Sequence, residues 1–266
     1  ILPQRIVPDH PRHRPRLPDP AQSRRGDREF PRHQPHLRRL RSVPEFPRRL
    51  ERLGCAPESL NAILVTHEHG DHVGSAYAVA AKYNIPVWTS HGTYRATVNL
   101  RGADRAAVRF CRADDVFSIG DLQILPYTVP HDAREPLQFV FNDGARYLGV
   151  LTDAGMSTEY LCAHLEGMHA LVLECNHDRE MLANSAYPWS LKQRIGGDFG
   201  HLANDIASGI LTRVRHAALQ TVVAAHLSKQ NNTPLLAGQA IAVALGIDAG
   251  DVPIADQEEG LPWCTV

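Results

Sequence analysis

Four potential metal ligands lie within six residues, in the segment 67–72, His-Glu-His-Gly-Asp-His. This segment follows residues 62–66, an apolar run whose length is typical of a buried strand. His67 and His69 are two positions apart, so on an extended backbone their side chains point the same way. Imidazole nitrogens and carboxylate oxygens suit zinc, iron or manganese. The segment is too dense in ligands to be a chance grouping, and it predicts a metal site.

The His-x-His-x-Asp-His pattern after a strand resembles the signature of the metallo-β-lactamase superfamily. The resemblance implies an α/β (α+β) protein built as a four-layer αββα sandwich with two mixed sheets. It also implies two divalent metal ions, Zn²⁺ or Mn²⁺, as cofactors. The first ion would be held by His67, His69 and a later histidine. The second would be held by Asp71, His72, a bridging aspartate and a final histidine.

The later ligands that the superfamily pattern requires have matches at three predicted strand ends. His131 follows the strand expected at residues 124–129, and it fits the third histidine. Asp153 follows the strand expected at residues 147–152 and fits the bridging aspartate. His226 follows residues 221–225 and fits the last ligand. All three stand in the order of the superfamily pattern, which makes a coincidence of loop residues hard to sustain.

The chemistry that such ions imply is hydrolysis. Two ions a few ångströms apart hold a bridging water or hydroxide and lower its pKa towards neutrality. Asp71 is a candidate catalytic residue, because either it or Asp153 can orient that hydroxide or accept its proton. A separate nucleophile is not needed, so Ser75 and Cys175 are interpreted as structural.

Three further segments narrow the substrate. They are residues 174–182 with Asn176-His177-Asp178, residues 187–204 with Gly200-His201, and residues 226–234. Together they resemble the YycJ/WalJ branch of the superfamily, which is related to the RNase Z and RNase J nucleases. The resemblance covers about residues 48–250 of this sequence. It implies a phosphodiesterase that uses the bridging hydroxide on nucleic acid, as a 5′-to-3′ DNA exonuclease.

Several side chains of these segments have a chemistry compatible with that substrate. His201 and His177 are candidate catalytic residues that donate a proton to the leaving oxygen or bind a phosphate, and a capping or buried histidine is the alternative for each. Asn204 begins a predicted helix, where backbone N–H groups and the helix dipole favour anions. Lys229 and Asn231 complete the candidate substrate-binding set with His201 and Asn204.

Other residues of the same segments are ambiguous. Lys192 and Arg194 are either substrate contacts or a solvated helix face. Tyr187 and Trp189 have side chains that stack on bases in some proteins, but we interpret them as an ordinary packed turn. His91 also follows a predicted strand, and we interpret it as structural.

The elements that must position these residues alternate in type. Strands are predicted at residues 62–66, 85–88, 117–129 (two strands), 137–142, 146–152, 170–175 and 221–225. Helices are predicted at residues 47–53, 73–83, 158–164, 203–215 and 234–244. This interleaving argues for a layered α/β or α+β domain.

Residues 1–46 differ in texture from residues 47–266, which we interpret as one metallo-β-lactamase domain. Residues 1–49 hold 13 of the 25 arginines and 10 of the 19 prolines, without apolar periodicity, which predicts disorder. The glycine- and serine-rich opening strands of the family have no counterpart there. We therefore interpret the segment as a wrong-frame translation or a fragment boundary, rather than as a basic arm, and expect the first sheet to lack its opening strands.

Composition restricts the compartment and the partners. Residues 50–266 carry a net charge of −9, which does not favour a non-specific nucleic-acid binder. The sequence has no long apolar run and no signal peptide, so we expect no membrane span and no secretion. The five scattered cysteines predict free thiols in the cytoplasm.

Two other functions fit the sequence. One is a metal-dependent hydrolase of a small substrate, such as a cyclic phosphate ester or a thioester. The other is a non-catalytic metal-binding module, which the absent opening strands motivate. The sequence leaves open the native metal, DNA versus RNA, the polarity of cleavage and the oligomeric state.

Overall fold

The computed structural model describes residues 45–266, and the hypothesis about residues 1–46 lies outside the described residues apart from its last two positions. The strands in this part of the chain are β1 (Ile63–Val65), β2 (Val87–Thr89), β3 (Val108–Phe110), β4 (Phe117–Ile119), β5 (Leu122–Thr128), β6 (Leu137–Asn142), β7 (Tyr147–Leu151), β8 (Ala170–Glu174) and β9 (Thr221–Ala225). The helices are α1 (Glu45–Arg52), α2 (Ala76–Tyr83), α3 (His91–Thr97), α4 (Glu159–Leu165), α5 (Arg179–Asn184), α6 (Trp189–Ile195), α7 (Asn204–Val214) and α8 (Pro234–Leu245). Two 3₁₀ turns are η3 (Pro57–Ser59) and η4 (Ala249–Asp251).

The strands form two sheets. The first is parallel, in the order β1-β2-β3. The second runs β4-β5-β6-β7-β8-β9, antiparallel from β4 to β7 and parallel from β7 to β9. Since β6 is antiparallel to both of its neighbours, β5, β7, β8 and β9 all point the same way. The loops that follow these four strands therefore leave one edge of the second sheet together.

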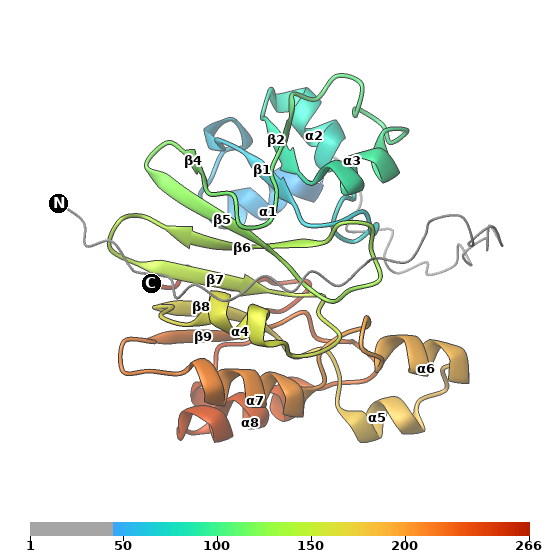
Figure 1. Cartoon of the computed structure of the whole chain (residues 1–266), viewed down its shortest axis with the longest axis vertical. Helices are drawn as coiled ribbons and strands as arrows, with labels where there is room; N and C mark the ends of the chain where they lie inside the picture. The colour runs from blue at the N-terminus through green and yellow to red at the C-terminus, as the bar shows by residue number, and fades with distance from the viewer. Residues whose placement is uncertain (1–44) are drawn as a thin grey trace, which may run out of the picture. The chain divides into compact units, whose positions relative to one another are not determined.

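The two sheets pack face to face between helices, as Figure 1 shows. Leu64 and Trp88 of the first sheet pack against a buried cluster that includes Ile124 and Phe139 of the second. The outer face of the first sheet packs against α2, and that of the second against α4, α7 and α8. The expected αββα sandwich is confirmed.

Capping residues explain where several helices begin. Thr158, Asp178 and Thr233 each accept a hydrogen bond from the backbone N–H three residues later, at the start of α4, α5 and α8. Gly246, with a φ of 73°, ends α8 in the left-handed conformation. Among the described helices, none has the length and apolar character of a membrane span.

All the expected helices and strands are present, with ends that differ by a few residues. The predicted elements do not include α3, β3, α5 or α6, although a helix is one of the alternatives for Lys192 and Arg194. Each has seven or fewer residues, and β3 carries Arg109 at its centre, so none shows a periodic apolar pattern.

Candidate metal centre

The ligands expected from the sequence meet where the loops of both sheets converge. The loop after β1 supplies four candidate ligands, His67, His69, Asp71 and His72. His131, Asp153 and His226 come from the loops after β5, β7 and β9. Potential ligand atoms lie within 4.8 Å of one another in three groups drawn only from these residues: His67, His69 and His131; His67, His72 and Asp153; and Asp71, His72 and His226. Whether these atoms bind metal stays a prediction, but the structure brings all seven residues together.

Asp153 lies in the middle of this cluster. Its carboxylate oxygens are 3.0 Å from His72 Nε2, 3.8 Å from His131 Nε2 and 3.7 Å from His226 Nε2. Its side chain is buried, with 2% exposure. One carboxylate that faces histidines from both sheets is the arrangement that a ligand shared by two ions requires.

The Nδ1 atoms of three of these histidines have hydrogen-bond partners in the protein. Thr66 Oγ1 lies 3.0 Å from His67 Nδ1 and 3.1 Å from His72 Nδ1. His131 Nδ1 lies 3.0 Å from the carbonyl oxygen of Gly200. Such partners keep the proton on Nδ1 and leave the Nε2 lone pair free for a metal.

Glu174, the last residue of β8, holds the other side of the cluster. Its Oε1 lies 2.9 Å from His201 Nδ1 and 2.8 Å from His226 Nδ1. Its Oε2 accepts hydrogen bonds from the backbone N–H groups of Ala154 and Leu202. This fully buried carboxylate thus positions His201, His226 and the backbone beside Asp153.

Two observations indicate that the cluster fits cations. His67 Nε2 and Asp153 Oδ2 are buried and have no hydrogen-bond partner in the part of the chain that the structure describes, although His72 Nε2 lies at ion-pair distance from Asp153 Oδ2. Unpaired buried polar atoms are costly unless a ligand satisfies them. Asp153 and His226 also have φ angles of 54° and 58°, a left-handed conformation that non-glycine residues adopt at a cost. The nitrogen and carboxylate donors suit Zn²⁺ or Mn²⁺.

The electrostatics differ across the cluster. Burial, helped by the neighbouring His72, lowers the pKa of His67 to about 2. Burial also acts to lower the pKa of His226, but the carboxylates of Asp153 and Glu174 outweigh it and raise that pKa to about 10. Burial opposes ionisation of Glu174, and yet the charges and hydrogen bonds of His201 and His226 lower its pKa to about 2. The carboxylates of Glu174 and Asp153, whose pKa values are both lowered, are therefore ionised.

His201, a candidate catalytic residue, lies at the edge of this cluster. Its Nδ1 is 3.5 Å from Asp153 and is held by Glu174. Close backbone contacts put it there: a Cβ on Gly155 would overlap the backbone of Asp198, and a Cβ on Gly200 would overlap the carbonyl of Ile195. Only glycine at these two positions lets the loop before His201 lie against the centre.

The remaining substrate-binding candidates are Asn204, Lys229 and Asn231. Asn204 exchanges side-chain hydrogen bonds with Asn232, and its backbone N–H bonds the carbonyl of His177, so both of its polar groups are engaged. Lys229 pairs with Glu258 at 2.6 Å. Asn231 is buried, and its Oδ1 has no hydrogen-bond partner among the described residues. The substrate-binding roles of these residues stay predictions, to which the hydrogen bonds of Asn204 add a structural role.

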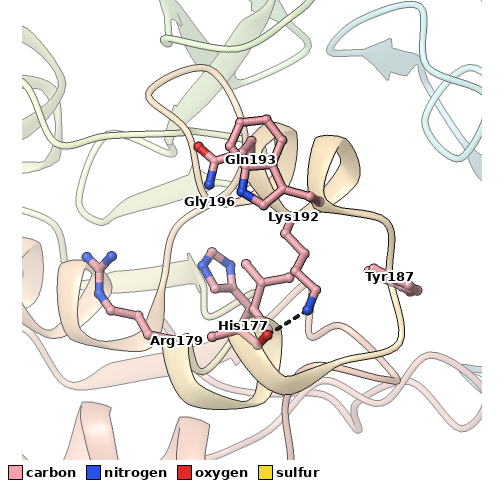
Figure 2. Close-up of a pocket in the computed structure, with 9 residues that line it drawn as sticks. His177, Arg179, Tyr187, Lys192, Gln193 and Gly196 are labelled. Atoms are coloured by element: carbon pink, nitrogen blue, oxygen red, sulfur yellow. Dashed lines mark hydrogen bonds between the residues drawn. The ribbon is translucent and has the colours of Figure 1, made fainter.

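His177 and the aromatic pair lie in a pocket beside the centre. His177 is buried and lines this pocket together with Tyr187 and Trp189 (Figure 2). The interpretation of Trp189 as part of a packed turn is wrong, because its side chain is 75% exposed. Arg194, on the same helix, pairs with Asp132 at 2.6 Å.

Sequence reasoning gave Glu174 no role of its own. The available signal was an ionisable residue at the end of the apolar run 170–173, which is an unusual place for a charge. His91 opens α3 and packs edge to face on Phe110, with ring centroids 5.4 Å apart.

Comparison with known proteins agrees with this picture. The family model described as "Beta-lactamase superfamily domain" matches residues 24–227. An exodeoxyribonuclease YycJ of Bacillus anthracis is 35% identical over 76% of this chain and 79% of its own length. An exodeoxyribonuclease WalJ of Streptococcus pneumoniae is 32% identical over 71% of each chain. The crystal structure of the metallo-β-lactamase fold protein YhfI of Bacillus subtilis superposes with a TM-score of 0.59 and 18% identity, covering 78% of this chain and 79% of that one.

Proposed function

Because this chain belongs to the β-lactamase superfamily, we propose that it is a metal-dependent hydrolase of phosphodiester bonds, and more narrowly a 5′-to-3′ DNA exonuclease. The observation that carries the proposal is the clustering of the seven candidate ligand residues, with Asp153 among three of the histidines, where the loops of the two sheets meet. The likeness to two exodeoxyribonucleases, over more than two thirds of their length, supports DNA as the substrate.

We infer that the cofactors are two divalent ions, Zn²⁺ or Mn²⁺. The first would be held by His67, His69 and His131, and the second by Asp71, His72 and His226, with Asp153 between them. When bound, such ions polarise the phosphoryl oxygen and lower the pKa of a water molecule.

We assign proton transfer to two side chains, Asp71 and His201. The Asp71 carboxylate is 40% exposed, against 2% for Asp153, so it is the carboxylate of the set that substrate and solvent reach. We assign it the orientation and deprotonation of the attacking water. Burial acts against a charge on His201, but the adjoining Glu174 carboxylate raises the pKa of that imidazole above its ordinary value. With Nδ1 bonded to Glu174, Nε2 of His201 is the atom we assign to protonate the leaving oxygen.

The test is an assay of the purified protein with Mn²⁺ or Zn²⁺ on 5′-labelled duplex DNA and on bis-p-nitrophenyl phosphate. Cleavage of both substrates, with labelled mononucleotide as the first DNA product, is the expected result. Cleavage of the small ester alone would identify a small-substrate hydrolase. Bound metal without any turnover would identify a non-catalytic metal-binding module.

A matched pair of variants ties this activity to the centre. Asp71→Ala is expected to abolish cleavage of both substrates. Asp121→Ala makes the same change on an exposed residue in the turn between β4 and β5, and it should leave activity unchanged. Full activity of Asp71→Ala would refute the assigned site.

We further infer that the protein acts in the cytoplasm. All five cysteines are free thiols, and three of them are buried. Such thiols persist in a reducing compartment.

A further inference from the structure

The pocket that contains His177 has walls formed by α5, α6 and the segments next to them. It has a volume of about 570 Å³. Its lining includes His177, Arg179, Tyr187, Trp189, Lys192 and Gln193. This volume is within the range of pockets for small organic ligands, about 300–1,000 Å³.

His177 gives the pocket an unsatisfied polar group. It is 1% exposed, and its Nδ1 has no hydrogen-bond partner within residues 45–266. Figure 2 shows its ring in the middle of the pocket, with the side chains of Arg179 and Lys192 on either side. A ligand that pairs with this nitrogen removes the cost of leaving it buried and unpaired.

The lining combines aromatic surface with positive charge. Trp189 is 75% exposed, which is unusual for a side chain of this size, and Tyr187 is partly buried nearby. The ammonium of Lys192 donates to the carbonyl of Ala183 at 2.6 Å and keeps further N–H groups for a ligand. Arg179 is held by Asp205 at 2.8 Å. None of the described residues that line the pocket carries a carboxylate, although residues 50–266 have a net negative charge.

One chain segment joins the pocket to the metal centre. It leaves β8 at Glu174, forms the pocket, and returns to His201, whose backbone N–H bonds the carbonyl of Ile195 at 2.9 Å. A bridge between His177 and Ala203 closes the segment on itself. Glu174 and His201, at its two ends, are hydrogen-bonded to each other within the centre. The pocket and the metal centre therefore share one segment of the chain, whose ends, Glu174 and His201, lie in the centre.

We propose that this pocket is a nucleotide subsite, which holds one unpaired nucleotide of the substrate strand next to the bond that is cleaved. The base stacks on Trp189 and Tyr187, the sugar-phosphate lies against Lys192 and Arg179, and His177 makes a hydrogen bond to the nucleotide. This inference rests on the proposed nuclease function. It adds that the enzyme takes the end of a strand as a separated nucleotide rather than as a paired one.

Trp189→Ala tests the subsite, with Trp263→Ala as the matched control. Both side chains are about three-quarters exposed, at 75% and 73%, so neither truncation opens the core. The readout is the ratio of kcat/KM for a single-stranded oligonucleotide to kcat/KM for bis-p-nitrophenyl phosphate, which has no nucleobase. Loss of one stacked base predicts a fall of about tenfold in this ratio for Trp189→Ala. Trp263→Ala should keep the wild-type ratio.

A titration of the metal-loaded protein with deoxyadenosine monophosphate supplies a reading that needs no turnover. Saturable quenching of tryptophan fluorescence is expected in the wild type and in Trp263→Ala, and it should disappear in Trp189→Ala. An unchanged ratio in Trp189→Ala, or an equal loss on both substrates, overturns the subsite and leaves the nuclease function standing. If the wild type cleaves no nucleic acid, the proposed function fails, and the titration alone then decides whether the pocket binds nucleotides.

Discussion

The two sides of the metal centre hold their histidines by different means. On the side of the first sheet, the neutral hydroxyl of Thr66 contacts both His67 and His72. On the side of the second sheet, the buried carboxylate of Glu174 contacts both His201 and His226. The pKa of His67 is lowered to about 2, mainly by burial, whereas the carboxylates raise that of His226 to about 10.

This difference separates two tasks. The Thr66 side presents the neutral imidazole of His67, which is a good metal ligand as it stands. The Glu174 side concentrates negative charge and strengthens the basicity of His226, as a carboxylate behind a metal-bound histidine does. It also supports His201, which we place in proton transfer. We therefore expect a substitution of Glu174 to lower metal affinity more than a substitution of Thr66.

The largest effect is expected where the two sides meet. Asp153→Asn removes the charge that faces histidines from both sheets, and it should lower kcat by about 1,000-fold or more. Initial rates on bis-p-nitrophenyl phosphate measure this, with circular dichroism to verify the fold. An activity within tenfold of the wild type would show that Asp153 is not the shared ligand.

Glu174→Gln should come next. The amide cannot accept from two imidazoles and two backbone N–H groups, so metal affinity should fall about 10- to 100-fold. Competition with a chelator measures this affinity. Glu166→Gln is the matched control, because Glu166 is exposed after α4 and the same exchange there should change nothing. Unchanged metal affinity in Glu174→Gln would show that the Glu174 carboxylate does not support the metal ligands.

Thr66→Val should have the smallest effect of the three. Valine keeps the shape of the side chain and loses only the hydroxyl that holds two rings, so metal affinity should fall by no more than about tenfold. Thr128→Val, on an exposed position at the end of β5, is the control. A loss in Thr66→Val that equals or exceeds that in Glu174→Gln would reverse the comparison between the two sides.

The same two sides differ in how much the sequence predicts. On the first side the candidate ligands are close together in the sequence, and the composition of residues 67–72 alone predicts a metal site. On the second side His131, Asp153 and His226 are dispersed, and only their positions at predicted strand ends, together with the superfamily resemblance, single them out. Because β5, β7, β8 and β9 run in the same direction, those strand ends do meet.

What the sequence did not predict depends on contacts between distant segments. Glu174 has no spacing partner, and its role appears only when β8 lies between β7 and β9. The exposure of Trp189 depends on how α6 lies over the loop that follows β8, which no local pattern encodes. The short α3, β3, α5 and α6 were not predicted for a related reason, since tertiary packing rather than periodicity stabilises them.

The central claim is that the two sides of the centre together hold two ions, and metal stoichiometry tests it most directly. The wild type, Asp153→Asn and Glu166→Gln would be loaded with Mn²⁺ or Zn²⁺, desalted, and measured by inductively coupled plasma mass spectrometry. The account predicts two ions per chain in the wild type and in Glu166→Gln, and fewer in Asp153→Asn. A wild-type protein that retains one ion or none after loading, or an Asp153→Asn variant that retains both, would contradict it.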